Sequence, residues 1–395
     1  MRRMLGAAVV VAALFAVGVF SYILGARHPA VLSGALTGTA TPTAGRLAIN
    51  PQFDYATDFR DGLAAIRFGD DKSGKYGYID VSGKIVINPQ FEWTDHFGEG
   101  LALIRVGDDT TGRYGYVDKA GKYQINPQFN YASSFSEGLA PVRIGDEKAG
   151  KWGYINKAGS YVINPQFDGA SEFHDGLAEV RIGDDKTGKW GYIDKTGKYA
   201  VNPQFDATNP FAEGLAEVRR GDFETGRWGF IDAAGRYVIN SQYGGGEYLV
   251  IASGEFVALG SFHDGLAAVR NGDSRAGKWG FIDKTGRYVV DPQFDDVGVF
   301  EEGLAAVRIG DEKTGKYGYI DATGHYQINP QFDWTYGFSQ GLALMRVGDE
   351  KTGKYGYIDE TGRVVINPQF DETGGFTSDG LAVVKIAGKY GYIAR

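Results

Sequence analysis

The chain has 395 residues, no cysteine, 60 glycines and 14% aromatic residues, a composition typical of a globular β-rich protein and not of a disordered one. The absence of cysteine excludes disulfide bonds, thiolate metal sites and thiol nucleophiles. Residues 46–395 hold all 49 acidic residues and all but three of the 41 basic ones, and this acidic balance argues against a nucleic-acid partner.

The chain begins with Arg2, Arg3 and an uncharged segment of twenty residues. That length fits a membrane span better than the roughly 7 to 15 apolar residues of a cleavable signal, so we expect a signal anchor within residues 1–26. A cleaved signal peptide is the alternative. The arginines place the rest of the chain outside the cytoplasm. We therefore expect an extracytoplasmic protein that is anchored to the inner or cytoplasmic membrane or, after cleavage, is periplasmic or secreted. Residues 27–45, rich in Gly, Ala, Thr and Pro, are expected to form a flexible linker.

The remainder, residues 46–395, repeats one sequence with a period of 38 residues and a single longer step of 51. The tetrapeptide Asn-Pro-Gln-Phe, or a close variant of it, marks each copy. A fixed period between roughly 20 and 50 residues is the signature of a stacked array. The tetrapeptides begin at Asn50, Asn88, Asn126, Asn164, Asn202, Asn240, Asp291, Asn329 and Asn367.

Each copy is expected to form a three-stranded antiparallel unit. Residues 176–181 (Gly-Leu-Ala-Glu-Val-Arg) alternate in the way a strand requires, and residues 189–194 (Lys-Trp-Gly-Tyr-Ile-Asp) form a second, aromatic strand. A short loop that contains Gly197 connects the second strand to a third at 198–201. The Asn-Pro that follows is expected to end the third strand, because proline cannot donate to a sheet ladder.

The second strand carries the features that indicate stacking. Gly191 is Gly in all nine copies, which indicates close approach by a neighbouring backbone. The residue before it is Trp in four copies and Tyr in five, so we expect a flat ring at this position to pack between repeats. A lone unit buries too little apolar surface to fold, and stability is expected to come from contacts between neighbouring copies.

The two ends of the array are complementary. Residues 46–49 match a third strand without its first two, and residues 388–393 match a second strand without its third. Ring-shaped repeat folds close in this way. We therefore favour an all-β, propeller-like ring of nine units, with an open β-solenoid as the alternative. The longer step adds 13 residues near 244–260, which we expect to form an extra β-hairpin, either a contact element or a tolerated surface insertion.

The second strands carry a recognisable motif. Lys-Trp-Gly-Tyr-Ile at 151–155, Lys-Trp-Gly-Tyr-Ile-Asp at 189–194 and Lys-Trp-Gly-Phe-Ile-Asp at 278–283 each precede the tetrapeptide or its variant. With Glu/Asp-Gly-Leu-Ala, this combination resembles the WG-containing repeat family of bacterial proteins, over residues 46–395. The resemblance implies an often exported β-repeat protein with no catalytic residues to carry over. Five copies depart from the pattern by having Tyr for Trp, which argues against the Trp itself as a ligand-binding residue.

No arrangement of side chains in the sequence points to catalysis or to a metal. The loop at 183–188 (Gly-Asp-Asp-Lys-Thr-Gly) recurs in eight copies but lacks the alternating ligands and terminal Glu of a calcium loop. The five histidines fall at different positions of the repeat, and no pair has ligand spacing. A column of arginines that begins with Arg67 is expected to pair with the aspartates that end the second strands, such as Asp80. We predict no catalytic residue, no metal site and no cofactor.

One variable position of the repeat indicates a binding surface. The second residue after the tetrapeptide is aromatic in copies one, two, three and eight, but is Gly, Ala, Asp or Glu in other copies. A position that accepts Gly and Glu does not belong to a core, so we expect these rings on exposed loops that share one arc of a closed ring. Scattered surface aromatics are the alternative. The candidate binding residues are Tyr55, Trp93, Tyr131 and Trp334.

Three functions follow from these features. We expect a non-enzymatic scaffold that binds an unidentified protein partner. Binding of carbohydrate or peptidoglycan through the loop aromatics is the alternative. An envelope hydrolase with an unrecognised carboxylate pair is a third possibility, and clustered carboxylates with raised pKa in the ring would be its sign.

Overall fold

The structure is a computed structural model, and it describes residues 45–395 except 223–224, 245–247, 251–255 and 273–276. Every regular element in this part of the chain is a β-strand. Within the same residues, no helix has the length and apolar character that a membrane crossing needs. The predicted signal anchor, and the predicted linker up to residue 44, lie outside the described residues.

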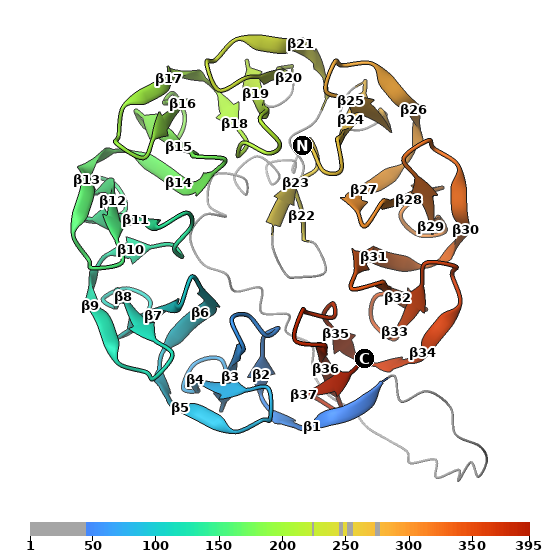
Figure 1. Ribbon diagram of the computed structural model, residues 1–395, viewed down its shortest axis with the longest axis horizontal. Coiled ribbons are helices and arrows are strands. Elements are labelled where there is room, and N and C mark those ends of the chain that lie inside the picture. Colours follow the sequence, from blue (N-terminus) through green and yellow to red (C-terminus); the bar gives the residue numbers. More distant parts are fainter. Residues whose placement is uncertain (1–44, 223–224, 245–247, 251–255, 273–276) are drawn as a thin grey trace, which may run out of the picture.

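The described strands form a closed ring of nine blades, which is a nine-bladed β-propeller (Figure 1). In each blade, antiparallel strands follow one another from an innermost strand near the ring axis to an outer strand on the circumference. The prediction of an all-β, propeller-like ring is confirmed. The open solenoid is wrong, because the first and last strands of the array pair with each other.

The blades are numbered here by the order of their second strands. The innermost strands of the described residues are β2 (Tyr55–Ala56), β6 (Trp93–Gly98), β10 (Tyr131–Ala132), β14 (Gly169–His174), β18 (Ala207–Thr208), β27 (Asp296–Glu301), β31 (Trp334–Ser339) and β35 (Glu372–Thr373). The second strands are β3 (Leu63–Phe68), β7 (Leu101–Val106), β11 (Leu139–Ile144), β15 (Leu177–Ile182), β19 (Ala216–Arg220), β24 (Leu266–Asn271), β28 (Leu304–Ile309), β32 (Leu342–Val347) and β36 (Leu381–Ile386). The third strands are β4 (Lys75–Asp80), β8 (Arg113–Asp118), β12 (Lys151–Asn156), β16 (Lys189–Asp194), β20 (Arg227–Ile231), β25 (Lys278–Asp283), β29 (Lys316–Asp321), β33 (Lys354–Asp359) and β37 (Lys389–Ala394). The outer strands are β5 (Ile85–Phe91), β9 (Tyr123–Phe129), β13 (Tyr161–Phe167), β17 (Tyr199–Phe205), β21 (Tyr237–Tyr243), β26 (Tyr288–Phe294), β30 (Tyr326–Phe332), β34 (Val364–Phe370) and β1 (Arg46–Phe53).

The predicted three-stranded unit is wrong, because the blades have a fourth, innermost strand. In the described part of the chain only blade six has a three-stranded sheet, β24-β25-β26. The innermost strand is as short as two residues in β2, β10, β18 and β35, and it pairs on one side only. It therefore has neither the length nor the alternating pattern by which a strand is recognised in a sequence.

The outer strand is longer than predicted, because it continues through Asn-Pro-Gln-Phe. β17 ends at Phe205, and its register with β16 shifts between Trp190 and Tyr192. Pro203 falls within this irregular stretch of a strand that is paired on one side only. A proline is tolerated there because no ladder hydrogen bond is lost.

The invariant glycine of the third strand lies against this irregular stretch. A Cβ atom on Gly191 would come within 2.4 Å of the carbonyl oxygen of Val201 and 2.6 Å of the nitrogen of Pro203. The predicted close backbone approach is confirmed, and the approaching backbone is the outer strand of the same blade.

An aromatic ring packs across each of the nine junctions between described blades. In blade four, the buried Tyr192 meets Phe211 of blade five with 4.8 Å between ring centroids, and its hydroxyl donates to the backbone oxygen of Asn209 at 2.8 Å. This ring follows the invariant glycine, whereas the sequence pattern predicted that the ring before the glycine would pack between repeats. The ring before the glycine mainly covers its own innermost strand, although Tyr114 and Tyr390 also reach the next blade. The junction pairs are Phe59–Tyr392, Tyr78–Phe97, Tyr116–Phe135, Tyr154–Phe173, Tyr192–Phe211, Phe230–Phe262, Phe281–Phe300, Tyr319–Phe338 and Tyr357–Phe376.

The ring closes where β1 pairs with β37. Ile49 lies opposite Tyr392, and Phe53 lies opposite Tyr390. Ile49 and Phe53 are buried in the cluster that joins blade nine to blade one. The start of the array thus supplies the outer strand of the last blade, as the complementary ends predicted.

The 13-residue insertion contains the predicted hairpin. β22 (Tyr248–Val250) pairs antiparallel with β23 (Phe256–Ala258) as a separate two-stranded sheet. The two strands lie inside the ring of blades in Figure 1. Gly244 pairs with Arg270 where other blades begin their innermost strand, so the insertion starts at the position that the candidate rings occupy elsewhere.

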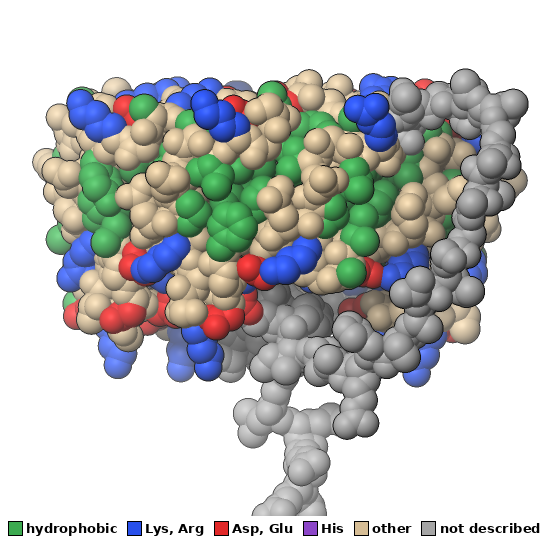
Figure 2. Space-filling model, turned by 90° about the horizontal axis from the view of Figure 1, so that it is seen from below, with side chains coloured by type: hydrophobic (Ala, Val, Ile, Leu, Met, Phe, Trp, Pro, Cys, Tyr) green, Lys and Arg blue, Asp and Glu red, His purple; other side chains and the backbone are tan. Residues whose placement is uncertain are grey.

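Apolar side chains are exposed around the circumference of the ring. Figure 2 shows them on the side wall, between rows of charged side chains. They come from the starts of the outer strands, such as Ile85, Tyr161 and Tyr199, and from the ends of the second strands, such as Phe68. Because every blade contributes, this belt is a property of the repeat and not of one place on the ring.

Candidate functional site

The four candidate rings begin the innermost strands of four blades. Tyr55 starts β2, Trp93 starts β6, Tyr131 starts β10 and Trp334 starts β31. The expectation that they lie on loops is wrong, because the unforeseen fourth strand begins at this position. Tyr55 is 38% exposed and the other three rings are half-buried. Blades eight, nine, one, two and three are consecutive in the closed ring, so these residues share one arc. We call the four rings the aromatic arc, and the side of the ring where innermost strands begin the arc face.

The rings of the arc are flanked by other rings. Tyr55 lies 5.9 Å from Tyr76 of its own blade and 5.8 Å from Tyr390 of blade nine, between ring centroids. Tyr131 likewise lies between rings of blades two and three, with centroid distances of 5.2 and 5.5 Å. Trp334 contacts two tyrosines of blade eight, one of them at 4.1 Å. Each of these three rings therefore contacts two other aromatic rings.

Guanidinium groups lie over the same rings. The Cζ atom of Arg67 is 5.6 Å from the ring centroid of Tyr55 and 5.4 Å from that of Tyr76. Arg67 also forms an ion pair with Asp71 in the following loop. Corresponding cation–ring contacts involve Arg143 with Tyr131 and Arg346 with Trp334. The arc therefore combines Tyr, Trp and Arg side chains at one surface.

The predicted ion pairs between the arginine column and the strand-ending aspartates are wrong. Asp80 lies opposite Leu63, at the far end of β3 from Arg67, so the two cannot meet. Asp80 instead accepts hydrogen bonds from the backbone N–H groups of Ser82 and Lys84 in its own turn. Arginines of the column instead pair with loop aspartates, as Arg67–Asp71, Arg105–Asp109 and Arg181–Asp185.

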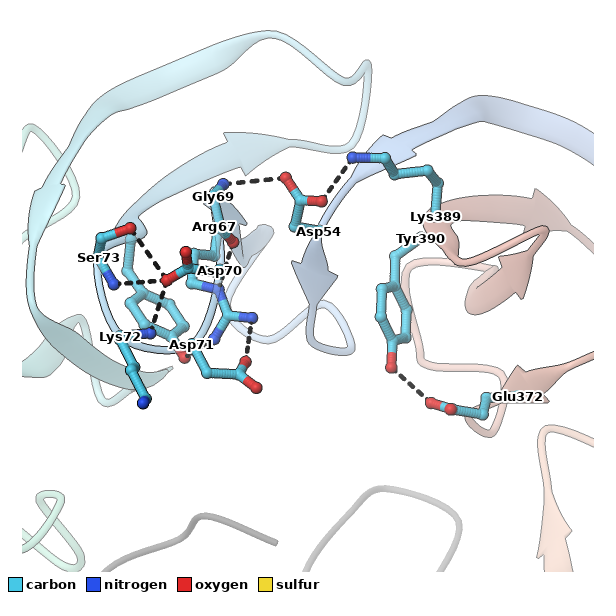
Figure 3. Close-up of polar contacts among 11 residues, drawn as sticks. Asp54, Arg67, Gly69, Asp70, Asp71, Lys72, Ser73, Glu372, Lys389 and Tyr390 are labelled. Atoms are coloured by element: carbon cyan, nitrogen blue, oxygen red, sulfur yellow. Dashed lines mark hydrogen bonds and ion pairs between the residues drawn. The ribbon is translucent and has the colours of Figure 1, made fainter. Parts of the chain in front are cut away.

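Beside the arc, one carboxylate joins two blades (Figure 3). Asp54 accepts a hydrogen bond from the backbone N–H of Gly69 at 2.9 Å and forms an ion pair with Lys389 of blade nine. The bonds from Lys389 and Gly69 lower the pKa of the Asp54 carboxyl below its ordinary value. The lysine-to-carboxylate bridge recurs at other junctions, as Lys75–Glu92, Lys151–Asp168, Lys189–Asp206, Lys278–Asp295, Lys316–Asp333 and Lys354–Asp371.

In blades seven and nine, the innermost strand begins with a carboxylate, Asp296 or Glu372, where the arc has an aromatic ring. The hydroxyl of Tyr390 donates to Glu372 and that of Tyr317 donates to Asp296, each at 2.5 Å. Glu372 also pairs with Lys385. The arc face therefore presents hydrogen-bonding groups of both signs beside its rings.

The recurring Gly-Asp loop does not assemble a metal site in the part of the chain that the structure describes. One oxygen of Asp70 accepts the backbone N–H groups of Lys72 and Ser73 at 2.9 and 2.8 Å (Figure 3). This is the side-chain-to-backbone bonding that aspartate gives a turn. Among the described residues, no three His, Asp or Glu side chains gather as metal ligands would.

Three buried carboxyls, Asp58, Glu179 and Glu217, were not predicted as candidate residues from the sequence. Burial raises the pKa of Asp58 and of Glu179 to about 7 and that of Glu217 to about 8. Glu179 is hydrogen-bonded to Ser171, and Glu217 accepts from Asn209 at 2.6 Å. The cause is burial and not a second carboxylate, so these groups are not the carboxylate pair that a hydrolase would need. The sequence does contain a sign of two of these buried carboxyls. Glu179 and Glu217 occupy a strand position that is Ala, Leu, Pro or Val in the other copies.

These carboxyls give a pH-dependent stability. A carboxyl whose pKa is raised on folding stabilises the native state most below its unfolded pKa, near 4, and this stability is lost as pH rises through about 7 to 8. We expect the melting temperature to fall between pH 5 and pH 9, and the Glu217→Gln variant to recover on the order of 1–3 kcal/mol at the higher pH. Thermal melts across the pH series measure both effects. Glu312→Gln, at an exposed position, should follow the wild type. A wild-type melting temperature that rises over this range would contradict the assignment.

Comparison with solved structures finds chains of similar fold. The chain is similar to a structure described as the crystal structure of the eukaryotic initiation factor, with a TM-score of 0.56 and 12% identity over 84% of this chain and 91% of that one. It is more distantly similar to prolyl oligopeptidase B from Galerina marginata (TM-score 0.41, 9% identity, 78% of this chain and 54% of that one). The β-propeller domain of the trilobed protease from Pyrococcus furiosus matches with a TM-score of 0.37 and 8% identity, over 71% of this chain and 99% of that one. Identities this low show shared fold alone.

No curated protein sequence matches the chain. A family model described as the WG containing repeat, however, matches eight segments that together span more than half of it. These segments are residues 43–72, 76–108, 114–147, 152–186, 190–222, 279–312, 317–350 and 355–390. The longest internal stretch without a match, residues 223–278, contains the third and outer strands of blade five, the insertion and the second strand of blade six. With the repeated motif, the ring and this match in agreement, the chain belongs to the family of WG-containing repeat proteins.

Proposed function

We propose that this protein is a non-enzymatic scaffold outside the cytoplasm, whose arc face binds a partner protein. The observation that carries the proposal is the gathering of Tyr, Trp and Arg side chains along the aromatic arc. These residue types dominate the binding energy of protein–protein interfaces, because they bury large areas at low entropic cost. The sequence supports the location, since the uncharged N-terminal segment and the two arginines before it favour export.

The geometry of the rings favours a protein over a glycan. A sugar stacks on an open aromatic face, whereas Tyr55, Tyr131 and Trp334 each contact two other rings in T-shaped or tilted geometry. Their edges, hydroxyls and neighbouring guanidinium groups suit the mixed polar and apolar surface of a protein partner. The Lys-to-carboxylate bridges hold this surface in place before binding, which lowers the entropic cost of association.

The arc can be tested by quantitative capture. The full chain in detergent is immobilised and exposed to envelope extract from its own source, with crosslinking and mass spectrometry to identify what is held. A Trp93→Ala/Trp334→Ala double variant is expected to lose at least about tenfold of the captured partner, because two anchors of about 1–3 kcal/mol are removed. Its stability should fall only modestly, since both rings are half-buried.

A matched control removes two rings from the outer wall. Tyr161→Ala/Tyr199→Ala takes away two exposed aromatic side chains and should leave capture unchanged. Sedimentation with purified peptidoglycan tests the glycan alternative with the same variants. Equal capture by the arc variant and the wild type would refute the proposal, and arc-dependent sedimentation would replace the protein partner with a glycan.

A further inference from the structure

A cavity lies on the other side of the ring from the arc face. Its volume is ≈ 380 Å³, within the range of small-molecule sites. Its lining comes from blades one, two, eight and nine, close to the turns that end the innermost strands, whereas the aromatic arc marks the starts of those strands. The lining includes Asp58, Arg60, Phe97, Ser339, Gly375 and Thr377.

Missing side chains in blade nine make room here. Blade nine has Gly374 and Gly375, where blades two to five carry larger residues such as His96 and Glu172. A Cβ atom on Gly374 would lie 2.4 Å from Oδ1 of Asp58. The glycines therefore admit the carboxylate of blade one to the inner edge of blade nine.

One oxygen of the Asp58 carboxylate has a structural role. The backbone N–H of Val383 donates to it. At the matching positions of blades one and four, a hydroxyl of the same blade takes this role, from Thr57 at 3.1 Å and from Ser171 at 3.2 Å. Gly374 has no hydroxyl, so the carboxylate of Asp58, from the next blade, accepts the backbone N–H of Val383 instead.

The other oxygen of the carboxylate, Oδ1, has no hydrogen-bond partner among the described residues. Asp58 is only 8% exposed, and no donor among the described residues reaches its Oδ1 atom. A buried oxygen of this kind costs free energy unless a ligand or water donates to it.

The polar groups around the cavity include two further acceptors. The hydroxyl of Ser339 donates its proton to the backbone oxygen of Phe376 at 3.0 Å, and that of Thr377 donates to Leu381 at 3.3 Å. Because both protons are committed, the two hydroxyl oxygens are left with lone pairs. A ligand that only donates hydrogen bonds suits such a lining.

We propose that this cavity binds a small organic cation through a primary ammonium group placed against Oδ1 of Asp58. An ammonium group has three N–H donors and no acceptor, which matches one carboxylate oxygen and two hydroxyl oxygens. The phenylalanine rings of the lining add a surface that attracts cations. A divalent metal fits less well, because Asp58 and Asp61 are the only carboxylates that the described residues bring to the lining, and Asp61 is engaged with the backbone N–H of Gly100.

Arg60 also lines the cavity and limits which cations fit. Its charge favours the ionised form of Asp58 but repels a second cation. A ligand with a single positive charge at the Asp58 end therefore satisfies the cavity better than one with charges close together. This site does not depend on the partner proposed for the arc face, since the two lie at opposite ends of the innermost strands.

The test uses 4-aminobutan-1-ol, whose amine is protonated at neutral pH, as the probe and 1,4-butanediol as a neutral molecule of the same length. Binding to the full chain in detergent is followed by saturation-transfer NMR. The amine should bind and the diol should bind at least about tenfold more weakly, the loss expected for a charge-assisted hydrogen bond. Asp58→Asn keeps an acceptor for Val383 and should weaken amine binding about tenfold.

Controls separate the site from a change in folding. Glu217→Gln removes a different buried carboxyl and should leave amine binding unchanged. Thr377→Val keeps the shape and should weaken binding by about two- to fivefold. Affinity should rise from pH 6 to pH 8 as Asp58 ionises. The tyrosines near enough to interact with Asp58 do not titrate in this range, because burial raises the pKa of each hydroxyl further above its ordinary value. They are Tyr55, Tyr336, Tyr357 and Tyr392. Equal binding of amine and diol, or full binding by a folded Asp58→Asn variant, would overturn the proposal.

Discussion

Deletion of residues 46–53 should open the ring and remove much of its stability. This segment is β1, the outer strand of blade nine, and it brings Ile49 and Phe53 into the cluster between blades nine and one. Two buried side chains of this size contribute about 3–6 kcal/mol, before the ladder to β37 is counted. A domain is commonly stable by only about 5–15 kcal/mol, so we expect a melting temperature lower by more than about 10 °C.

Calorimetry measures this loss, and light scattering measures a second consequence. Without β1, the edge of β37 is exposed, and a free strand edge favours pairing with another chain. The variant should therefore associate at concentrations where the wild type does not. Deletion of residues 27–44, which lie before β1, is the control and should leave the melting temperature within about 1 °C. Equal stability of the two deletions would mean that the ring does not depend on its closing strand.

The Gly191→Ala variant should lose about 3 kcal/mol or more, although only one methyl group is added. The new Cβ atom would meet the carbonyl oxygen of Val201 at 2.4 Å and the nitrogen of Pro203 at 2.6 Å. Both are backbone atoms of β17, so no side-chain rotation can relieve the contact. The outer strand has to move away, and the register shift that places Asn-Pro-Gln-Phe has to change with it.

Urea denaturation compares this variant with one at a permissive glycine. Gly98 lies at the end of β6, a Cβ atom added to it would have its nearest neighbour 3.8 Å away, and its backbone is not left-handed. Gly98→Ala should stay within about 0.5–1 kcal/mol of the wild type. Equal effects at the two positions would show that the close approach at Gly191 is not what fixes this residue as glycine.

The candidate site was only partly predictable. The sequence located the four rings of the aromatic arc and, through the complementary ends, the adjacency of blades eight, nine, one, two and three. It misplaced the rings on loops, because β2 and β10 are too short to leave a pattern. It also missed the neighbours of Tyr55, since Tyr390 is more than 300 residues away in the chain. Contacts between the first and last blades exist only after the ring has closed.

Within one blade, too, the sequence could not predict which side chains meet, as the arginine column shows. Arg67 and Asp80 both recur in the repeat, and opposite charges favoured pairing them. The antiparallel register places Asp80 opposite Leu63, so Arg67 pairs with Asp71 and covers aromatic rings. Sequence identifies which charges recur, whereas strand register decides which of them can touch.

By itself, the sequence determined the repeat, the β class, the invariant glycine and the closure by split ends, because these depend on spacing and on the volume of a single residue. Only the tertiary structure decided the innermost strand, the ring after the glycine that packs across each junction, and the cavity beside Asp58. Those features arise between blades, where residues distant in the chain meet. Their free energy depends on the curvature and register of the closed ring, and no local pattern of residues records either.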